Sequence, residues 1–239
     1  MSTNKPHPHP VHLFSALAVK KALDDVILTA FTERTGTTVE GVYDPTNVLL
    51  RRIEEGARPE VMVGVTGSFP ALCEAGVIDE ASVRDLARVG VGLAVPPGAE
   101  PPAIDTVDAL VTALRSARSV AYSRTGASGV HFAGLLERLG IADEVNERAT
   151  VVEKGFTALA VTDGRADLAV QQMSELMFVP EARVVGPLPD GAQHLTELSV
   201  ALGTAAVGRA GARALHAFLT GEEAQDAYRN AGLEVPPAG

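Results

Sequence analysis

The stretch VHLFSALAVKKALDDVILTAFTERTGTTVE (11–40) decides the fold class. It opens with a short apolar run, VHLFSA (11–16), which predicts a buried strand. Apolar residues then recur at helical spacing over 19–36, and Gly36 ends that pattern. A second β-prone run, TTVEGVYD (37–44), follows. The order strand, helix, strand predicts a parallel α/β unit.

The same alternation continues along the chain. VMVGV (61–65) is fully apolar, which is typical of a strand buried on both faces, and helices are predicted on either side of it. VGVGLAVPPG (89–98) is extended and leads to Pro101 and Pro102, where we expect the chain to pass to a second unit. The elements predicted outside these runs are helices over 47–56, 67–76, 106–116, 129–139, 156–164 and 212–232, and extended segments over 119–123, 151–155, 166–172, 183–189 and 195–206.

These elements predict a two-lobed α/β clamshell in which each lobe is a mainly parallel sheet flanked by helices. The first lobe would comprise residues 1–93 and 196–239, and the second residues 94–195. In α/β sheets of this kind, ligands bind beyond the carboxyl ends of the strands. The ligand cleft is therefore expected between the lobes, and its candidate residues lie in strand-to-helix loops.

Composition narrows the partners that such a cleft can serve. The 239 residues are 46% hydrophobic and 21% charged, as in ordinary globular proteins. The formal net charge of -10 argues against a nucleic acid or an anionic membrane surface as partner. Aromatic residues make up 4% and Trp is absent, which disfavours ligands that need stacking. The expected ligand is therefore a small polar molecule, bound by a local arrangement of hydrogen-bond donors.

Two further features bear on compartment and topology. No stretch of the sequence approaches the roughly 20 apolar residues that a membrane-spanning helix needs. The residues before the first strand, MSTNKPHPHP (1–10), contain no apolar run typical of a signal peptide. We therefore expect a cytoplasmic protein without a membrane partner. The single cysteine, Cys73, cannot form an internal disulfide.

The loop YSRTGASG (122–129) is the strongest candidate for anion binding. It lies between a predicted strand and an apolar helix, so backbone N–H groups at the helix start are expected to point at the ligand. Hydroxyl groups add donors, and Arg124 is positioned to clamp a carboxylate. An ordinary capped helix start with a solvent-facing arginine is an equally good interpretation. The candidate residues are Ser123, Arg124, Ala127, Ser128 and Gly129.

Three loops of the first lobe offer neutral donors of the same kind. Ser15 and Ala16 follow the first strand, Thr46 and Asn47 follow the second, and Thr66 follows VMVGV. Each of these residues also suits a capping or turn role. We take them as candidate ligand donors because the three loops are expected at one edge of the sheet.

Gln171, Gln172 and His131 complete the candidate set. The two glutamines end a buried-looking strand, where at least one amide needs a partner and a ligand can supply it, although a structural partner is the commoner case. His131 stands two residues after Gly129, close to the anion loop and with a pKa suited to acid–base work. A lone helical histidine is more often an ordinary helix residue, and its neighbours make it a candidate.

Motifs for nucleotides and metals are missing. The sequence contains no P-loop, no G-x-G-x-x-G after a strand, no G-x-S-x-G and no cysteine or histidine cluster with zinc spacing. We therefore expect neither a cofactor nor a metal.

Several stretches resemble the type 2 periplasmic-binding-protein fold, and within it the molybdate-binding-protein-like family. They cover nearly the whole chain: VHLFSALAVKKALDDVILTAFTERTGTTVE (11–40), RRIEEGARPEVMVGVTGSFPALCEAGVID (51–79), TGASGVHFAGLLERLGIADEV (125–145) and ADLAVQQMSEL (166–176). The resemblance implies a clamshell that closes on a small anion. ASGVHF (127–132) and AVQQ (169–172) also resemble the branch that includes aconitate isomerase, a cofactor-free enzyme.

The same resemblance implies departures from the oxyanion-binding pattern. The serine that holds molybdate after the first strand corresponds to Ala18. The second serine-rich loop corresponds to residues 44–47, where Asp44 would repel a dianion if it pointed inward. The binding tyrosine is replaced near Gln171 or Gln172. An organic carboxylate is therefore expected in place of molybdate.

The resemblance implies a cofactor-free isomerase that moves a proton, by double-bond shift or cis–trans change, in a small unsaturated di- or tricarboxylate such as aconitate. His131 would be the base, Ser15 and Thr46 positioning donors, and Arg124 a carboxylate clamp. The alternative is a non-catalytic solute-binding protein that carries a carboxylate or molybdate-like oxyanion to an ABC permease. The absence of a signal peptide favours the enzyme.

Overall fold

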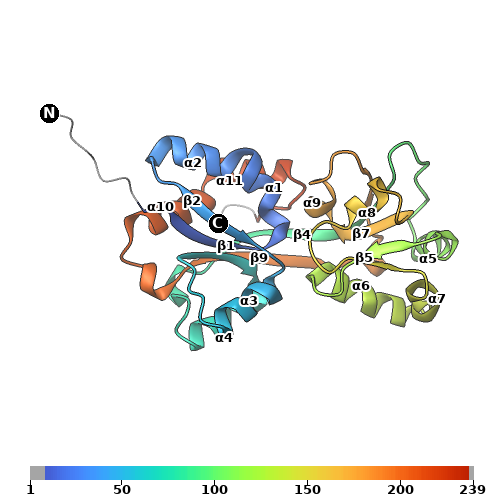
Figure 1. Ribbon diagram of the computed structural model, residues 1–239, viewed down its shortest axis with the longest axis horizontal. Helices are drawn as coiled ribbons and strands as arrows, with labels where there is room; N and C mark the ends of the chain where they lie inside the picture. Colours follow the sequence, from blue (N-terminus) through green and yellow to red (C-terminus); the bar gives the residue numbers. More distant parts are fainter. Residues whose placement is uncertain (1–8, 237–239) are drawn as a thin grey trace.

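The computed structural model describes residues 9–236, which form two lobes lying side by side (Figure 1). Residues 1–8 and 237–239, assigned above to the first lobe, lie outside the described residues. The nine strands form one hydrogen-bonded series that runs through both lobes. Two long strands, β4 (Arg84–Val95) and β9 (Leu195–Leu202), run along the waist between the lobes.

The first lobe is built on strands in the order β2-β1-β3-β9-β4. The strand β1 (Val11–Ser15) is parallel to β2 (Val39–Tyr43) and β3 (Val61–Val65), whereas β9 is antiparallel to β3 and β4. One face packs against α1 (Lys20–Ala22), α2 (Leu28–Thr35), α10 (Ala210–Leu219) and α11 (Glu222–Asn230), and the other against α3 (Thr46–Glu54) and α4 (Phe69–Glu74). Both faces are apolar, as the uninterrupted runs of β1 and β3 predict.

The second lobe repeats this plan. Its parallel strands are β5 (Val120–Tyr122), β6 (Thr150–Val151) and β7 (Leu168–Gln172), and β4 joins the antiparallel β7 and β8 (Arg183–Pro187). One face is covered by α5 (Val107–Ser116), α6 (Ala127–Arg138) and α7 (Ala142–Asn146), and the other by α8 (Ala158–Thr162) and α9 (Met173–Leu176).

The chain enters the second lobe within the continuous strand β4 and returns through residues 188–194, which precede β9. β4 pairs with β9 up to Gly90 and with β7 and β8 from Val91 onward, so the change of partner falls between these two residues. The Gln193 amide fixes this point, because its Oε1 accepts from the Val91 N–H (2.7 Å) and its Nε2 donates to the Val91 carbonyl (3.0 Å). The extended run beginning at residue 89 thus carries the chain from one lobe to the other.

Several predicted elements differ in detail. The prediction of a single helix over 212–232 is wrong, because this segment forms two helices. Gly221 between them has an extended backbone (ψ 166°), which lets Leu215 and Tyr228 enter the same core. The strand expected over 151–155 is reduced to β6, because the chain bends away and Gly155 has φ 92°. The helix over 19–36 is preceded by a 3₁₀ turn, Leu17–Val19, and contains a π-helical segment, Leu23–Ile27. The parallel pairing holds for three strands of each lobe, whereas the crossing strands are antiparallel.

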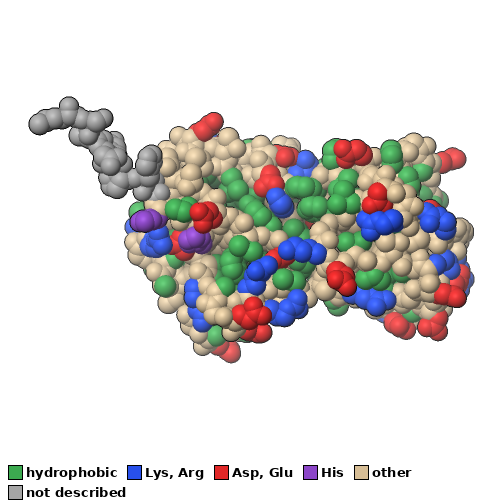
Figure 2. Space-filling model, in the orientation of Figure 1, with side chains coloured by type: hydrophobic (Ala, Val, Ile, Leu, Met, Phe, Trp, Pro, Cys, Tyr) green, Lys and Arg blue, Asp and Glu red, His purple; other side chains and the backbone are tan. Residues whose placement is uncertain are grey.

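Within the described residues, no helix combines the length and apolar character that crossing a membrane requires. On the face shown in Figure 2, acidic and basic side chains are interspersed, without a broad basic surface.

Candidate functional site

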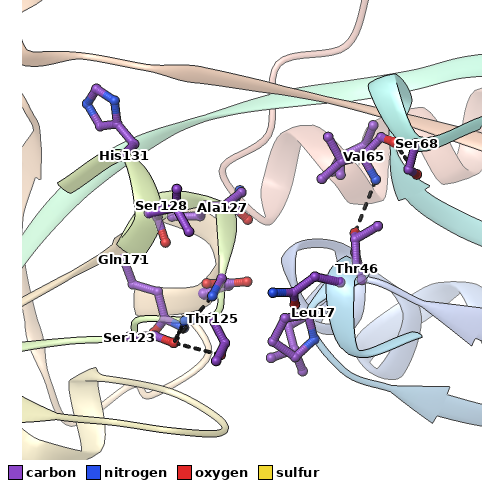
Figure 3. Close-up of a pocket in the computed structure, with 18 of the residues that line it drawn as sticks. Leu17, Thr46, Val65, Ser68, Ser123, Thr125, Ala127, Ser128, His131 and Gln171 are labelled. Carbon is purple, nitrogen blue, oxygen red and sulfur yellow. Dashed lines mark hydrogen bonds between the residues drawn. The ribbon is translucent and has the colours of Figure 1, made fainter. Parts of the chain in front are cut away.

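A cavity of about 490 Å³ lies between the lobes, at the carboxyl ends of their parallel strands. Most of its walls come from strand-to-helix loops, as the fold class predicts. The lining residues are Ala16, Leu17, Pro45, Thr46, Asn47, Leu50, Val65, Ser68, Ser123, Thr125, Gly126, Ala127, Ser128, Val130, His131, Gly155, Gln171, Gln172, Glu175, His194 and Leu198. Figure 3 shows the two opposing walls, with Thr46, Val65 and Ser68 facing the side that carries Ser123, Thr125 and Ala127.

The first-lobe wall is held by hydrogen bonds between neighbouring loops. The Thr46 hydroxyl accepts from the Val65 N–H (3.2 Å), which joins the start of α3 to the end of β3. The Ser68 hydroxyl donates to the Val65 carbonyl (2.7 Å). Thr46 therefore keeps its own hydroxyl hydrogen available, while that of Ser68 is already used.

The second-lobe wall is the start of α6. The Ser123 hydroxyl accepts from the Thr125 N–H (3.2 Å) and the Gly126 N–H (3.4 Å), and this turn places the first helical residue at Ala127. Gly129 packs so tightly that an added Cβ would lie 1.4 Å from the Ser123 carbonyl oxygen. The loop and the first helical turn are thus one rigid unit, in which Ala127 and Ser128 line the cavity.

The electrostatics of the cavity come from helix ends rather than from cations. No Lys or Arg is among the described residues that line it. Instead, α3 begins at Thr46 on one wall and α6 at Ala127 on the other. The N–H groups of a first helical turn have no acceptor within their helix and carry the positive end of its dipole. Both ends of the cavity therefore offer neutral donors suited to an anion.

The two glutamines at the end of β7 have different roles. Gln171 is used by the fold: its Oε1 accepts from the Thr157 N–H (2.7 Å) and hydroxyl (3.0 Å), and its Nε2 donates to the Gly155 carbonyl (3.0 Å). Gln172 is 4% exposed and lines the cavity, and its amide forms no hydrogen bond to another residue within 9–236. The Gln172 amide is therefore the one left for a ligand.

His131 lines the cavity, but one of its ring nitrogens is engaged. Its Nε2 lies 2.8 Å from the Ala192 carbonyl oxygen, which can only accept, so Nε2 carries the hydrogen and Nδ1 is the free acceptor of the neutral ring. The ring stacks on that of His194, with centroids 4.9 Å apart. Partial burial, with the His131 ring beside it, lowers the pKa of His194.

Glu175 is the only acidic residue in the cavity lining of the described chain. It lies in α9, immediately after β7, and is 8% exposed. Burial raises the pKa of its carboxyl to about 8, although the Gln171 side chain and the Gln172 backbone N–H act in the opposite direction. A group with this pKa can hold or release a proton near neutral pH.

Four residues singled out in the sequence do not line the cavity. Ser15 is fully buried and its hydroxyl donates to the Ala16 carbonyl (3.1 Å). Thr66 shares a hydrogen bond with the Ser199 hydroxyl (2.8 Å) and lines a separate cavity. Arg124 is exposed, and Gly129 forms the tight contact with Ser123. The other nine candidates lie together: Ala16, Thr46, Asn47, Ser123, Ala127, Ser128, His131, Gln171 and Gln172.

Asp44 does not point into the cavity. Its carboxylate is 1% exposed and pairs with Arg52 of the same lobe (2.9 Å) and with Lys154 of the second lobe (2.8 Å). The repulsion expected for an inward carboxylate is therefore absent, and the Asp44–Lys154 pair instead connects the two lobes. Ala18, the position corresponding to the molybdate-holding serine, is a core residue of the first lobe.

Glu175, His194 and Gly155 were missed in the sequence. Glu175 stands in MSELM, which reads as an ordinary amphipathic turn, and only its position after the two glutamines hinted at the cavity. His194 and Gly155 line the cavity because segments distant in the sequence meet there. A local sequence pattern cannot predict such a meeting. Within residues 9–236, the structure contains no group of three His, Cys, Asp or Glu side chains that could hold a metal.

Comparisons with known proteins identify the family of this chain and a relative with similar sequence. The model of the family described as bacterial extracellular solute-binding protein matches residues 11–234. An aconitate isomerase from a Pseudomonas species is 30% identical over 218 residues, which are 89% of this chain and 83% of that protein.

Solved structures share the two-lobed fold at low identity. The periplasmic molybdate-binding protein of Azotobacter vinelandii is 19% identical, with a TM-score of 0.78 over 95% of this chain and 99% of that one. The sulfate-binding protein of Mycobacterium tuberculosis is 18% identical, with a TM-score of 0.75 over 97% and 88%. These similarities confirm the type 2 periplasmic-binding-protein fold, related to molybdate-binding proteins, that the sequence predicts.

Proposed function

The chain belongs to the family of bacterial extracellular solute-binding proteins, and we propose that it uses the cavity of this fold as a cofactor-free isomerase of a small unsaturated di- or tricarboxylate such as aconitate. The ligand binds in the cavity between the lobes, and the reaction moves one proton within it. The similarity to an aconitate isomerase over most of both chains supports this reaction class.

The observation that carries the proposal is the pair of helix N-termini on opposite walls of the cavity. Two carboxylates at the ends of one small molecule match two separated donor sites without any cation between them. Ser128 and Gln172 add hydroxyl and amide donors on one wall, and Thr46 adds a hydroxyl on the other. The Ser123 hydroxyl hydrogen is already used, because Thr125 Oγ1 donates to the Glu153 carbonyl and so accepts from Ser123.

The apolar part of the lining favours a carbon skeleton over a tetrahedral oxyanion. Leu17, Leu50, Val65, Val130 and Leu198 lie among the polar groups. An oxyanion presents oxygen in every direction, and those facing these side chains would lose their hydrogen bonds to water without replacement. The carbon atoms of a polycarboxylate suit such a surface.

A non-catalytic receptor for a small anion is the second candidate, and the family membership favours it. Such a receptor would bind its ligand in the same cavity and release it unchanged to an ABC permease. The two candidates therefore differ in turnover and not in binding.

Binding and turnover are measured separately. We expect cis- or trans-aconitate, and the saturated analogue tricarballylate, to raise the melting temperature, whereas molybdate and sulfate do not. At a hundred times Kd the stabilisation is about 2.7 kcal/mol, or roughly 5–10 °C for a chain of this size. Proton NMR in deuterated water then follows aconitate, and we expect isomerisation together with uptake of deuterium from the solvent. Stabilisation without exchange or isomerisation would support the receptor.

The ion pair between the lobes is expected to contribute to ligand affinity. Lys154→Met removes the contact with Asp44 between the lobes, while Arg52 still neutralises Asp44. Because Lys154 is 68% exposed, the pair stabilises the closed arrangement by at most about 1 kcal/mol, so we expect aconitate to bind up to about fivefold more weakly by calorimetry. Lys21→Met, which removes an ion pair within the first lobe, is the control and is expected to leave affinity unchanged.

A further inference from the structure

Glu175 is a buried carboxyl group that the fold does not use as half of an ion pair. It is 8% exposed and lines the cavity. No salt bridge joins Glu175 to any residue within 9–236, in contrast to the buried Asp44 and Glu60, which both pair with arginine. A buried acid without a cation is costly to ionise and is rarely retained for stability alone.

The charged groups around α9 are engaged elsewhere. On α1, Lys20 and Lys21 pair with Asp24 and Asp25. The strands β4 and β8 also pack against α9, and their charged side chains have partners other than Glu175. In β4, Arg84 donates to the carbonyls of Ala81 and Val83, Asp85 accepts from Ser199, and Arg88 pairs with Glu234. In β8, Arg183 donates to the carbonyl of Ala99. The other titratable groups of the cavity are His131 and His194. Burial therefore dominates and raises the pKa of Glu175 to about 8.

A site that only binds anions gains nothing from such a group. When ionised, the Glu175 carboxylate repels the ligand that the helix N-termini attract. A glutamine of the same shape would donate a hydrogen bond at every pH. A carboxyl group poised to exchange a proton near neutral pH suits a site that moves protons.

We propose that the Glu175 carboxylate removes the migrating proton of the substrate and returns it to another carbon of the same molecule. This inference rests on the proposed function and assigns its catalytic base. In the first step, an O–H bond forms at Glu175 as an allylic C–H bond of the substrate breaks. The electron pair of that C–H bond enters the three-carbon unit and one of its carboxylates.

In the second step, the O–H bond breaks and a new C–H bond forms at the far end of the three-carbon unit. The double bond has then moved by one position, and Glu175 is again a carboxylate. No oxidant, reductant or second substrate is needed. The charge that develops on the substrate carboxylate is stabilised by the N–H groups at the start of α6 and by the Gln172 amide.

The first test is Glu175→Gln, which keeps the shape of the side chain but cannot accept a proton. We expect turnover of aconitate and deuterium uptake to fall by about a thousandfold. Below about pH 8 the Glu175 carboxyl is mostly protonated, so aconitate binding, measured by calorimetry, is expected to stay within a few-fold. Above that pH the substitution removes a negative charge, and binding is expected to tighten. Glu181→Gln, an exposed position shortly after α9, is the control and keeps full activity.

The pH profile of the unaltered protein is the second test and needs no variant to fold. The carboxylate is the working form, so kcat/KM is expected to rise tenfold per pH unit below about pH 8 and to level off above it. A profile that is flat between pH 6 and 9 contradicts the assignment.

The outcomes separate this inference from the proposed function. Absence of exchange and isomerisation in the unaltered protein overturns the proposed function. Normal exchange in the unaltered protein, with Glu175→Gln active within tenfold of it, overturns only the role of Glu175. Loss of turnover in His131→Ala together with an active Glu175→Gln would assign the proton transfer to His131, the base expected from the sequence.

Discussion

Replacing Gly129 with alanine is expected to destabilise the protein by about 3 kcal/mol, at the upper end of the cost of overpacking. The added methyl group would lie 1.4 Å from the Ser123 carbonyl oxygen and 2.5 Å from its carbon, and neither backbone atom can rotate away. The first turn of α6 must therefore move off the loop that follows β5. We expect the melting temperature to fall by roughly 6–12 °C and aconitate binding to be lost, because the N–H groups of that turn no longer point into the cavity.

Gly134→Ala is the matched control for this prediction. Gly134 lies in the same helix, is exposed, and has nothing within 4 Å of the position that a Cβ would take. Alanine favours a helix interior over glycine by about 1 kcal/mol, so this variant should be more stable and should bind normally. Equal melting temperatures for the two variants would show that the packing of α6 against Ser123 is not tight.

Replacing Gln171 with leucine is expected to cost about 3 kcal/mol, measured by urea unfolding. The substitution leaves the Thr157 N–H and the Gly155 carbonyl without their partners inside the protein, and each unpaired buried group costs about 1–3 kcal/mol. Because Gly155 lines the cavity, ligand affinity is expected to fall as well.

Gln172→Leu separates the structural effect from the binding effect. Its amide has no hydrogen-bond partner among the described side chains and backbone groups, so stability should change by less than about 1 kcal/mol. Affinity for aconitate should nevertheless fall about tenfold, the value of one hydrogen bond to a charged group. If Gln171→Leu keeps full stability while Gln172→Leu loses it, the roles assigned to the two amides are reversed.

Much of the fold could be predicted because its signals are local. The apolar strand VMVGV and the helical spacing after VHLFSA each depend on a few neighbouring residues. The break at Gly221 was missed although the sequence carries a signal for it. At 3.6 residues per turn, the buried positions before Gly221, such as Leu215 and Leu219, lie on the opposite side of a single helix from those after it, such as Ala227 and Tyr228. Only a break between the two sets lets both face the same core.

The candidate site could be predicted only as far as its loops. Residues of the loop 122–129 line the cavity, but Arg124 is exposed while Ser123 beside it faces the cavity. Neighbouring residues in a turn point in different directions, and sequence alone does not fix which of them faces the ligand. The cytoplasmic location and the absence of a cofactor stay predictions.

The discontinuity of the first lobe has a consequence for the order of assembly during synthesis. Every strand of the second lobe has been synthesised once residue 187 is made, so that lobe can complete its sheet before the rest of the chain is available. The first lobe cannot, because β9 stands between β3 and β4 in its sheet and its core includes Leu215 and Tyr228. The nascent chain therefore carries a finished second lobe beside an unfinished first one, and the anion cavity is among the last features to form.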